Sequence, residues 1–145
     1  MDNLLHKFYP ENVTVDIFFK ILCIVSFLVI TIDFIWIKLV MLQEYTVLLS
    51  GIQKTSIAVR LIPTILSYMT IILPIVLFSL PKVSKAHRLE DSLIYGGLLG
   101  VMMYGMFSFT NYALLEKWSI RVLLLDTIWG GILYTIVTYL ASYFL

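Results

Sequence analysis

Two carboxyl groups stand inside stretches of this sequence that are otherwise apolar. Asp33 lies in the run 17–37, and Asp126 lies near the start of the run 120–143. An aspartate in a membrane-spanning helix costs about 2.5–3.5 kcal/mol on insertion scales, so such residues normally face a bundle interior or a wet cavity. Two carboxyls that face one interior repel each other and lose hydration, so the pair could share a proton near neutral pH. Proton or ligand binding is therefore the chemistry that these residues favour.

Other polar side chains accompany the two aspartates. Each aspartate is followed three residues later by a tryptophan, a spacing that puts carboxyl and indole on one helix face. Counted from Lys38 and Arg121, both carboxyls lie roughly 7 Å inside the same boundary, so we expect them at one depth. The predicted polar layer, which we expect to bind a ligand, consists of Asp33, Asp126, Asn111, Tyr68, Tyr104, Trp36, Trp129, Thr110 and Ser108.

A structural interpretation of this layer stays open beside the functional one. Hydrogen bonds between these side chains would then only fasten the helices together, at about 0.6 kcal/mol each on average. Enzymatic chemistry is less favoured. His6 and His87 lie far from the layer, so no metal site is predicted, and no catalytic nucleophile with a neighbouring base is evident. We expect no catalytic residues and no cofactor.

The elements that hold these residues must be membrane-spanning helices. The chain has 145 residues, of which 61% are hydrophobic and 13% charged, against roughly 45–50% and about 25% in soluble domains. The stretches 61–81, 92–115 and 127–145 carry no charged side chain, and each is long enough to cross about 30 Å of hydrocarbon. Their backbone must be helical, because lipid cannot satisfy open backbone groups. The composition excludes a soluble globule, and a net charge of +1 provides no basic field for nucleic acid.

The predicted fold is all-α, a single transmembrane domain over residues 1–145 built as an antiparallel four-transmembrane-helix bundle. The spans cover about 17–37, 61–80, 93–115 and 120–143. Four spans place both termini on one side, here named side A, and the connections 38–60 and 116–119 on the other, side B. Apolar residues at helical intervals within 38–60 predict an extension of the first helix and a short interfacial helix before the second span.

Local breaks and small residues add detail to this bundle. Pro74 should kink the second span. Glycines in the third and fourth spans predict a close contact between helices, which we expect within the bundle rather than between two chains. The predicted packing positions are Gly96, Gly97, Gly100, Gly105, Gly130 and Gly131.

Orientation in the membrane does not follow from the charges. Side A carries five basic residues and side B carries five, so the positive-inside rule favours neither orientation. We expect an integral membrane protein with several spans. The sequence leaves open whether it lies in a cell membrane or in a virion membrane. The expected partner is the lipid bilayer; a homo-oligomer is compatible with the sequence, and nucleic acid is excluded.

The order of these residues resembles the small four-helix membrane proteins of the domain-of-unknown-function family DUF2177. The resemblance covers nearly the whole chain. The positions that carry it are Asp33, Trp36, Tyr45, Ala58, Tyr68, Gly97, Gly100, Tyr104, Gly105, Thr110, Asn111, Trp118, Asp126, Trp129 and Gly130. Family members usually have an aspartate three residues before the asparagine, where this chain has Ser108. The family has no established biochemical activity, and similar proteins occur in bacteria and in some large DNA viruses.

Two functions therefore stay open. The first is a small proton-coupled transporter or ligand-binding membrane protein, whose intramembrane site opens to side B and takes a proton or a small molecule. The alternative is a structural component of a virion or cell envelope, without transport or catalysis. The sequence contains no motif that identifies the ligand.

Overall fold

A computed structural model describes residues 5–9, 13–55 and 58–145. Within these ranges the regular elements are helices, which confirms the predicted all-α class. Four helices are long and apolar enough to cross a membrane, and they cover Val15–Gln53, Leu61–Lys82, Arg88–Leu114 and Ile120–Phe144. The chain is therefore a four-helix membrane protein.

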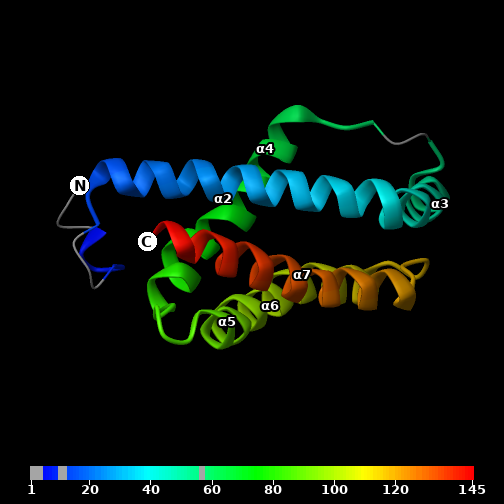
Figure 1. Cartoon of the computed structure of the whole chain (residues 1–145). Helices are drawn as coiled ribbons and strands as arrows, with labels where there is room; N and C mark the ends of the chain where they lie inside the picture. Colours follow the sequence, from blue (N-terminus) through cyan, green and yellow to red (C-terminus); the bar gives the residue numbers. More distant parts are fainter. Residues whose placement is uncertain (1–4, 10–12, 56–57) are drawn as a thin grey trace.

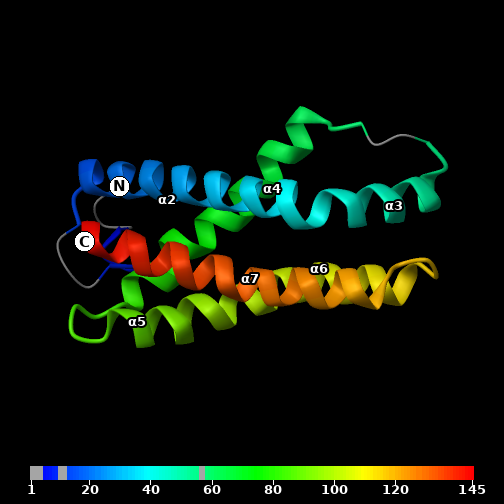
Figure 2. The same ribbon diagram turned by 45° about the vertical axis from the view of Figure 1, so that its right-hand side comes forward.

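The first spanning helix is much longer than a single crossing requires. It consists of α2 (Val15–Trp36), the π-helical segment η1 (Ile37–Met41) and α3 (Leu42–Gln53), 39 residues in all, whereas about 20 residues suffice. Figure 1 shows α2 lengthwise and α3 nearly end-on, and Figure 2 shows α3 lengthwise, so the helix bends where η1 lies. A π-helical turn is a recognised cause of such bends. The helix expected between the first two spans is thus α3, continuous with the first span.

Polar groups at the ends of α2 and α3 account for their limits. The Thr14 hydroxyl oxygen accepts a hydrogen bond from the backbone N–H of Ile17 at 3.4 Å, as an N-cap residue does. At the other end, Lys54 has a left-handed backbone, with φ of 57°, and its N–H bonds to the carbonyl of Ser50. This conformation ends the helix.

The second spanning helix crosses the others obliquely (Figures 1 and 2). It consists of α4 (Leu61–Pro74), the π-helical η2 (Ile75–Ser79) and the short η3 (Leu80–Lys82). Pro74, where the sequence predicts a kink, is the last residue of α4, and the helix changes type directly after it. Proline has no N–H and its ring crowds the preceding turn, so regular α-helical bonding cannot continue through it.

The third and fourth spanning helices lie side by side and antiparallel (Figures 1 and 2). The third consists of α5 (Arg88–Asp91), η4 (Ser92–Gly97) and α6 (Leu98–Leu114). The fourth consists of α7 (Ile120–Ala141) and η5 (Ser142–Phe144). A Cβ atom added to Gly130 would lie 2.5 Å from the Gly100 carbonyl oxygen, so the two backbones approach too closely for any side chain. Of the other predicted packing positions, Gly96, Gly97 and Gly131 also face this interface closely, whereas Gly105 has only ordinary contact distances.

Two apolar clusters fill the bundle, one towards each side. Helix α2 begins and α7 ends at one end of the bundle, side A (Figure 1). The cluster towards side A joins α2, α4, η2 and α7, and Val25, Leu133 and Tyr134 are fully buried in it. The cluster towards side B joins α3 to the start of α7 through Met41, Leu48, Trp118, Val122 and Leu123.

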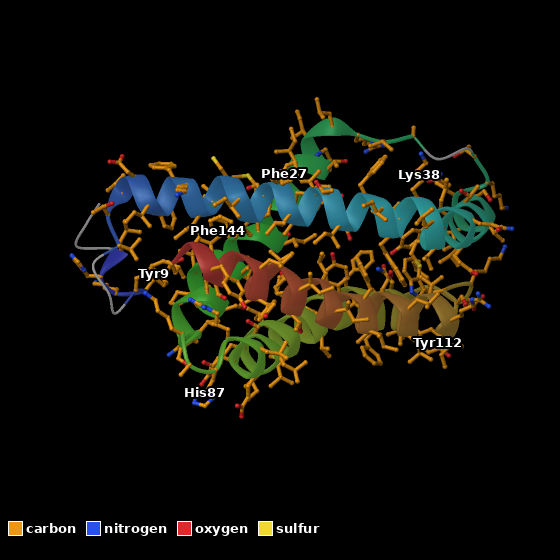
Figure 3. All side chains as sticks on the ribbon, in the orientation of Figure 1. Tyr9, Phe27, Lys38, His87, Tyr112 and Phe144 are labelled. Carbon is orange, nitrogen blue, oxygen red and sulfur yellow. The ribbon has the colours of Figure 1, made fainter. Side chains whose placement is uncertain are left out.

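The outer faces of the helices are apolar. Phe27, on α2, is 70% exposed, and Tyr112, on α6, is 46% exposed (Figure 3). Many further large apolar side chains are exposed on all four spanning helices. Such surfaces suit contact with lipid tails.

Candidate functional site

A cavity of about 320 Å³ lies between α2, η1, α3, α4, α6 and α7. Both aspartates line it, together with aromatic and apolar side chains from all these elements. The lining residues are Asp33, Trp36, Ile37, Met41, Tyr45, Ser67, Thr70, Ile71, Met103, Tyr104, Phe107, Asp126 and Trp129. The structure therefore brings five of the predicted polar-layer residues to one cavity.

Asp33 is held by donors from three other helices. Its side chain is 6% exposed. The Trp129 indole N–H donates to Oδ1 at 2.9 Å, and the Tyr104 hydroxyl lies 3.5 Å from the same oxygen. The Tyr68 hydroxyl donates to Oδ2 at 3.0 Å. One carboxyl on α2 thus contacts α4, α6 and α7.

Asp126 is held by two hydroxyl groups and is 3% exposed. The Tyr45 hydroxyl lies 2.7 Å from each carboxyl oxygen, and the Ser108 hydroxyl donates to Oδ2 at 3.1 Å. Tyr45 comes from α3 and Ser108 from α6. Ser108 occupies the position at which the sequence resemblance leads one to expect an aspartate, and here it serves as a neutral donor.

The predicted polar layer does not include Tyr45. It lies beyond residue 37, where the predicted first span ends, although it is one of the positions that carry the family resemblance. Helix α3 brings it to the cavity because α3 is fastened to the start of α7. Arg121 Nε lies 3.0 Å from Glu44 Oε1, and Lys117 Nζ donates to the Gly51 carbonyl at 3.2 Å.

The two aspartates contact successive turns of α6. Tyr104 contacts Asp33, whereas Ser108, four residues further along α6, contacts Asp126. Four residues of α-helix correspond to about 6 Å along the axis. The shared depth of the two carboxyls stays a prediction, because the Tyr104 side chain reaches much further from α6 than the Ser108 side chain does. The first spanning helix continues beyond Lys38. The residue that pairs with Arg121 is Glu44, further along the same helix.

The two tryptophans form a stacked pair at the cavity. The Trp36 and Trp129 rings lie 4.3 Å apart between centroids and are inclined by only 4°. While Trp129 donates its N–H to Asp33, the Trp36 Nε1 atom is buried and has no hydrogen-bond partner among the described residues. A buried N–H without an acceptor is costly.

Four predicted members of the layer are not part of the cavity lining: Tyr68 and Ser108 donate to the two carboxyls, and Thr110 and Asn111 have no such contact among the described residues. Thr110 is exposed on the outer face of α6, and Asn111 is half-buried. Helical geometry accounts for the outward position of Thr110. This residue follows Ser108 by two positions, which turns its side chain by about 200° around the helix axis. Tyr68 reaches Asp33 with its hydroxyl, and its neighbours Ser67 and Ile71 line the cavity.

The electrostatic character of the site is acidic. The donors to the two carboxyls are tyrosine, serine and tryptophan side chains, all of them uncharged. In the part of the chain that the structure describes, the cavity lining contains two carboxyl groups and no basic side chain. Such a site favours a bound proton or a bound cation, since either would reduce the cost of burying negative charge.

A family model described as a predicted membrane protein (DUF2177) matches residues 18–143. No curated protein and no solved structure matches the chain. The family match covers nearly the whole chain, both carboxyl groups of the cavity included. The chain therefore belongs to the DUF2177 family of predicted membrane proteins.

Proposed function

We propose that this member of the DUF2177 family binds a small solute in the intramembrane cavity and couples its transport to protonation of Asp33 and Asp126. The observation that carries the proposal is the placement of both carboxyls in the lining of one cavity, each held by uncharged donors. Its volume of about 320 Å³ lies within the usual range for small-molecule sites, about 300–1,000 Å³.

A further observation supports a functional cavity. The π-helical segment η1 contributes Ile37 and Met41 to the same lining. Single π-helical turns within α-helices are frequent at functional sites, where they aim side chains that a regular helix would turn elsewhere.

The shape of the bundle indicates the direction of access. The apolar cluster of Val25, Val29, Leu133 and Val137 fills the bundle on the side A flank of the cavity. Tyr45 and Met41 of the α3 region line the opposite flank. The smaller apolar cluster around Met41 and Trp118 covers this side B flank. We propose that a solute enters from side B by displacing that smaller cluster, and passage to side A would require the larger cluster to open.

The alternative function, a structural component of an envelope, has one observation in its favour. The hydrogen bonds of Asp33 and Asp126 join α2, α3, α4, α6 and α7, and such a network could serve only to hold the helices together. The two functions differ in whether they need the negative charge of the aspartates. Asparagine removes that charge but keeps the shape and most of the hydrogen-bonding capacity of aspartate, so the substitution distinguishes them.

The thermal unfolding of Asp33→Asn and Asp126→Asn in detergent at neutral pH separates the two functions. If the carboxyls serve binding, both variants should stay within about 1 kcal/mol of the wild type, because buried charge is costly and asparagine can still accept hydrogen bonds. If they are structural ties, each variant should lose about 3 kcal/mol or more. Glu116→Gln, in an exposed loop, is the matched control for removing a charge.

The proton-binding part of the proposal has its own test. Infrared spectra of the wild type at neutral pH, where exposed carboxyls are ionised, should show a protonated carboxylic acid band that disappears as the pH is raised to alkaline values. That band should be reduced in each single asparagine variant and absent in the double variant. A band of full size in the double variant would show that other groups hold the proton.

A further inference from the structure

We propose that the ligand of this cavity is an organic cation, namely a protonated or quaternary amine that carries an apolar group. The inference rests on the proposed binding function and adds the chemical class of the solute. It follows from three properties of one cavity: buried negative charge, aromatic rings and an apolar remainder.

The charge of the lining selects for a cation. Asp33 and Asp126 are 6% and 3% exposed, and their donors are neutral side chains. A carboxylate has about four acceptor positions, so each aspartate retains capacity for a further donor such as an ammonium N–H. A cation between them would offset the repulsion of two carboxylates in a low-dielectric site. An anionic solute would add to that repulsion.

The aromatic side chains favour an organic cation. The rings of Trp36, Trp129, Tyr45, Tyr104 and Phe107 all line the cavity. Ammonium groups are attracted to ring faces, most strongly to tryptophan, and the attraction grows when the site is desolvated. Aromatic rings around an acidic centre are the arrangement that recognises quaternary ammonium ligands.

The remaining lining fits an apolar substituent. Ile37, Ile71, Met41 and Met103 supply aliphatic and thioether surface around the charged centre. Methionine side chains are flexible and adapt to irregular ligand shapes. A cavity of about 320 Å³ has room for a single-ring amine, and the apolar lining offers little to a fully hydrated ion.

The decisive comparison uses two probes of the same shape that differ in one atom. Benzyltrimethylammonium is a cation, and neopentylbenzene has carbon in place of its nitrogen and is neutral. Binding of each to the full chain in lipid nanodiscs can be followed by tryptophan fluorescence, because two of the three tryptophans line the cavity. We expect the cation to bind at least about tenfold more tightly than the neutral probe.

The Asp33→Asn/Asp126→Asn double variant tests whether the cavity is the source of this preference. The preference for the cation should fall to less than about twofold in the double variant, and Glu116→Gln should retain it. Partition of the neutral probe into lipid is the same for every variant and cancels in this comparison. A preference that survives in the double variant would overturn the inference.

A second variant keeps the test valid if the double variant does not fold. Ser67 lines the cavity, and its hydroxyl bonds only to its own helix, at the Thr64 carbonyl. Ser67→Phe should fill part of the space, leave both carboxyls intact and weaken binding of benzyltrimethylammonium at least about tenfold. Unchanged binding in Ser67→Phe would place the cation elsewhere and overturn the inference.

The remaining outcomes separate this inference from the function on which it rests. Equal affinity of the wild type for both probes would overturn the cationic class and leave a solute-binding cavity in place. Absence of binding by either probe would also overturn the cationic class. The proposed function itself fails on a different measurement, a large loss of stability in the single asparagine variants.

Discussion

At the scale of single residues, Tyr45 holds the more deeply buried of the two carboxyls. Its hydroxyl lies 2.7 Å from both oxygens of Asp126, and Ser108 is the other donor. The hydrogen bond also joins α3 to α7, so it links a helix outside the predicted spans to the centre of the site. Tyr45 is therefore expected to affect both the stability of the bundle and the state of Asp126.

Tyr45→Phe should lower the free energy of unfolding by about 1.5–3 kcal/mol, the usual cost of losing a hydrogen bond to a charged group. The ring is retained, so the loss reports the hydroxyl alone. Tyr112→Phe, at a half-exposed position on the outer face of α6, is the control and should stay near the wild type. Equal stabilities of the two variants in chemical denaturation would contradict this role of Tyr45.

Much of the candidate site can be recognised from residue types alone. Asp33, Asp126, Trp36 and Trp129 stand out because polar or amphipathic groups are rare in apolar runs, and the structure places all four in the cavity lining. Tyr45 could not be recognised in this way, since its contact depends on a bend in the helix that precedes it. Thr110 is one of the predicted polar-layer residues, but helical rotation turns it outward.

At the scale of helices, the contact between α6 and α7 depends on glycine at two facing positions. A Cβ atom on Gly100 would overlap the carbonyl oxygen of Gly130, and one on Gly130 would lie 2.6 Å from Tyr104 Cβ. Tyr104 and Ser108 follow Gly100 on α6 and contact the two aspartates. The glycine contact therefore also sets how deeply α6 brings its hydroxyls into the site.

Gly100→Ala should destabilise the protein by about 2 kcal/mol or more, because the two backbones must separate to admit the methyl group. Gly51→Ala is the matched control, since a Cβ atom there meets nothing within 4 Å. Alanine has a higher helix propensity than glycine, so this control should gain up to about 1 kcal/mol. If thermal unfolding showed that both substitutions change the stability in the same direction, this would argue against a close contact at Gly100.

The helices themselves are largely predictable from hydropathy, because a lipid environment permits few alternatives to apolar helices. The irregular parts of these helices are less predictable from hydropathy. The first helix continues past Lys38 to Gln53, as the apolar residues within 38–60 predict, and a long lysine side chain can carry its charge outward from such a position. Pro74 indicates the irregularity at η2, but the π-helical segments η1 and η4 leave no clear trace in the sequence, since each differs from an α-helix by about one residue per turn.

At the scale of the whole molecule, the bundle has two distinct ends. The loop around His87 lies at side A, and the loop around Glu116 lies at side B, where α3 is also located (Figures 1 and 3). If the four helices span a membrane, these loops must lie on opposite sides of it. The balanced basic residues favour neither orientation.

Single-cysteine variants test this arrangement. His87→Cys and Glu116→Cys, each made with Cys23→Ser because Cys23 is the chain's own cysteine, place a thiol in each loop. A membrane-impermeant maleimide added outside sealed vesicles should label complementary fractions of the two variants, whichever orientation dominates. Complete labelling of both variants would contradict the four-span topology.

The π-helical segment η1 sets the direction in which α3 presents its side chains. A substitution that restored regular α-helical geometry over the same five residues, 37–41, would rotate α3 by about 100° relative to α2, because a π-helical turn takes up about one residue more than an α-helical turn. Tyr45 would then turn away from Asp126, and Met41 and Leu48 would leave the cluster around Trp118. Although this segment lies near the end of the apolar run, substitutions there that favour a regular α-helix should be tolerated as poorly as changes in a hydrophobic core, whereas a one-residue deletion that also removes the π-helical turn should keep α3 in place.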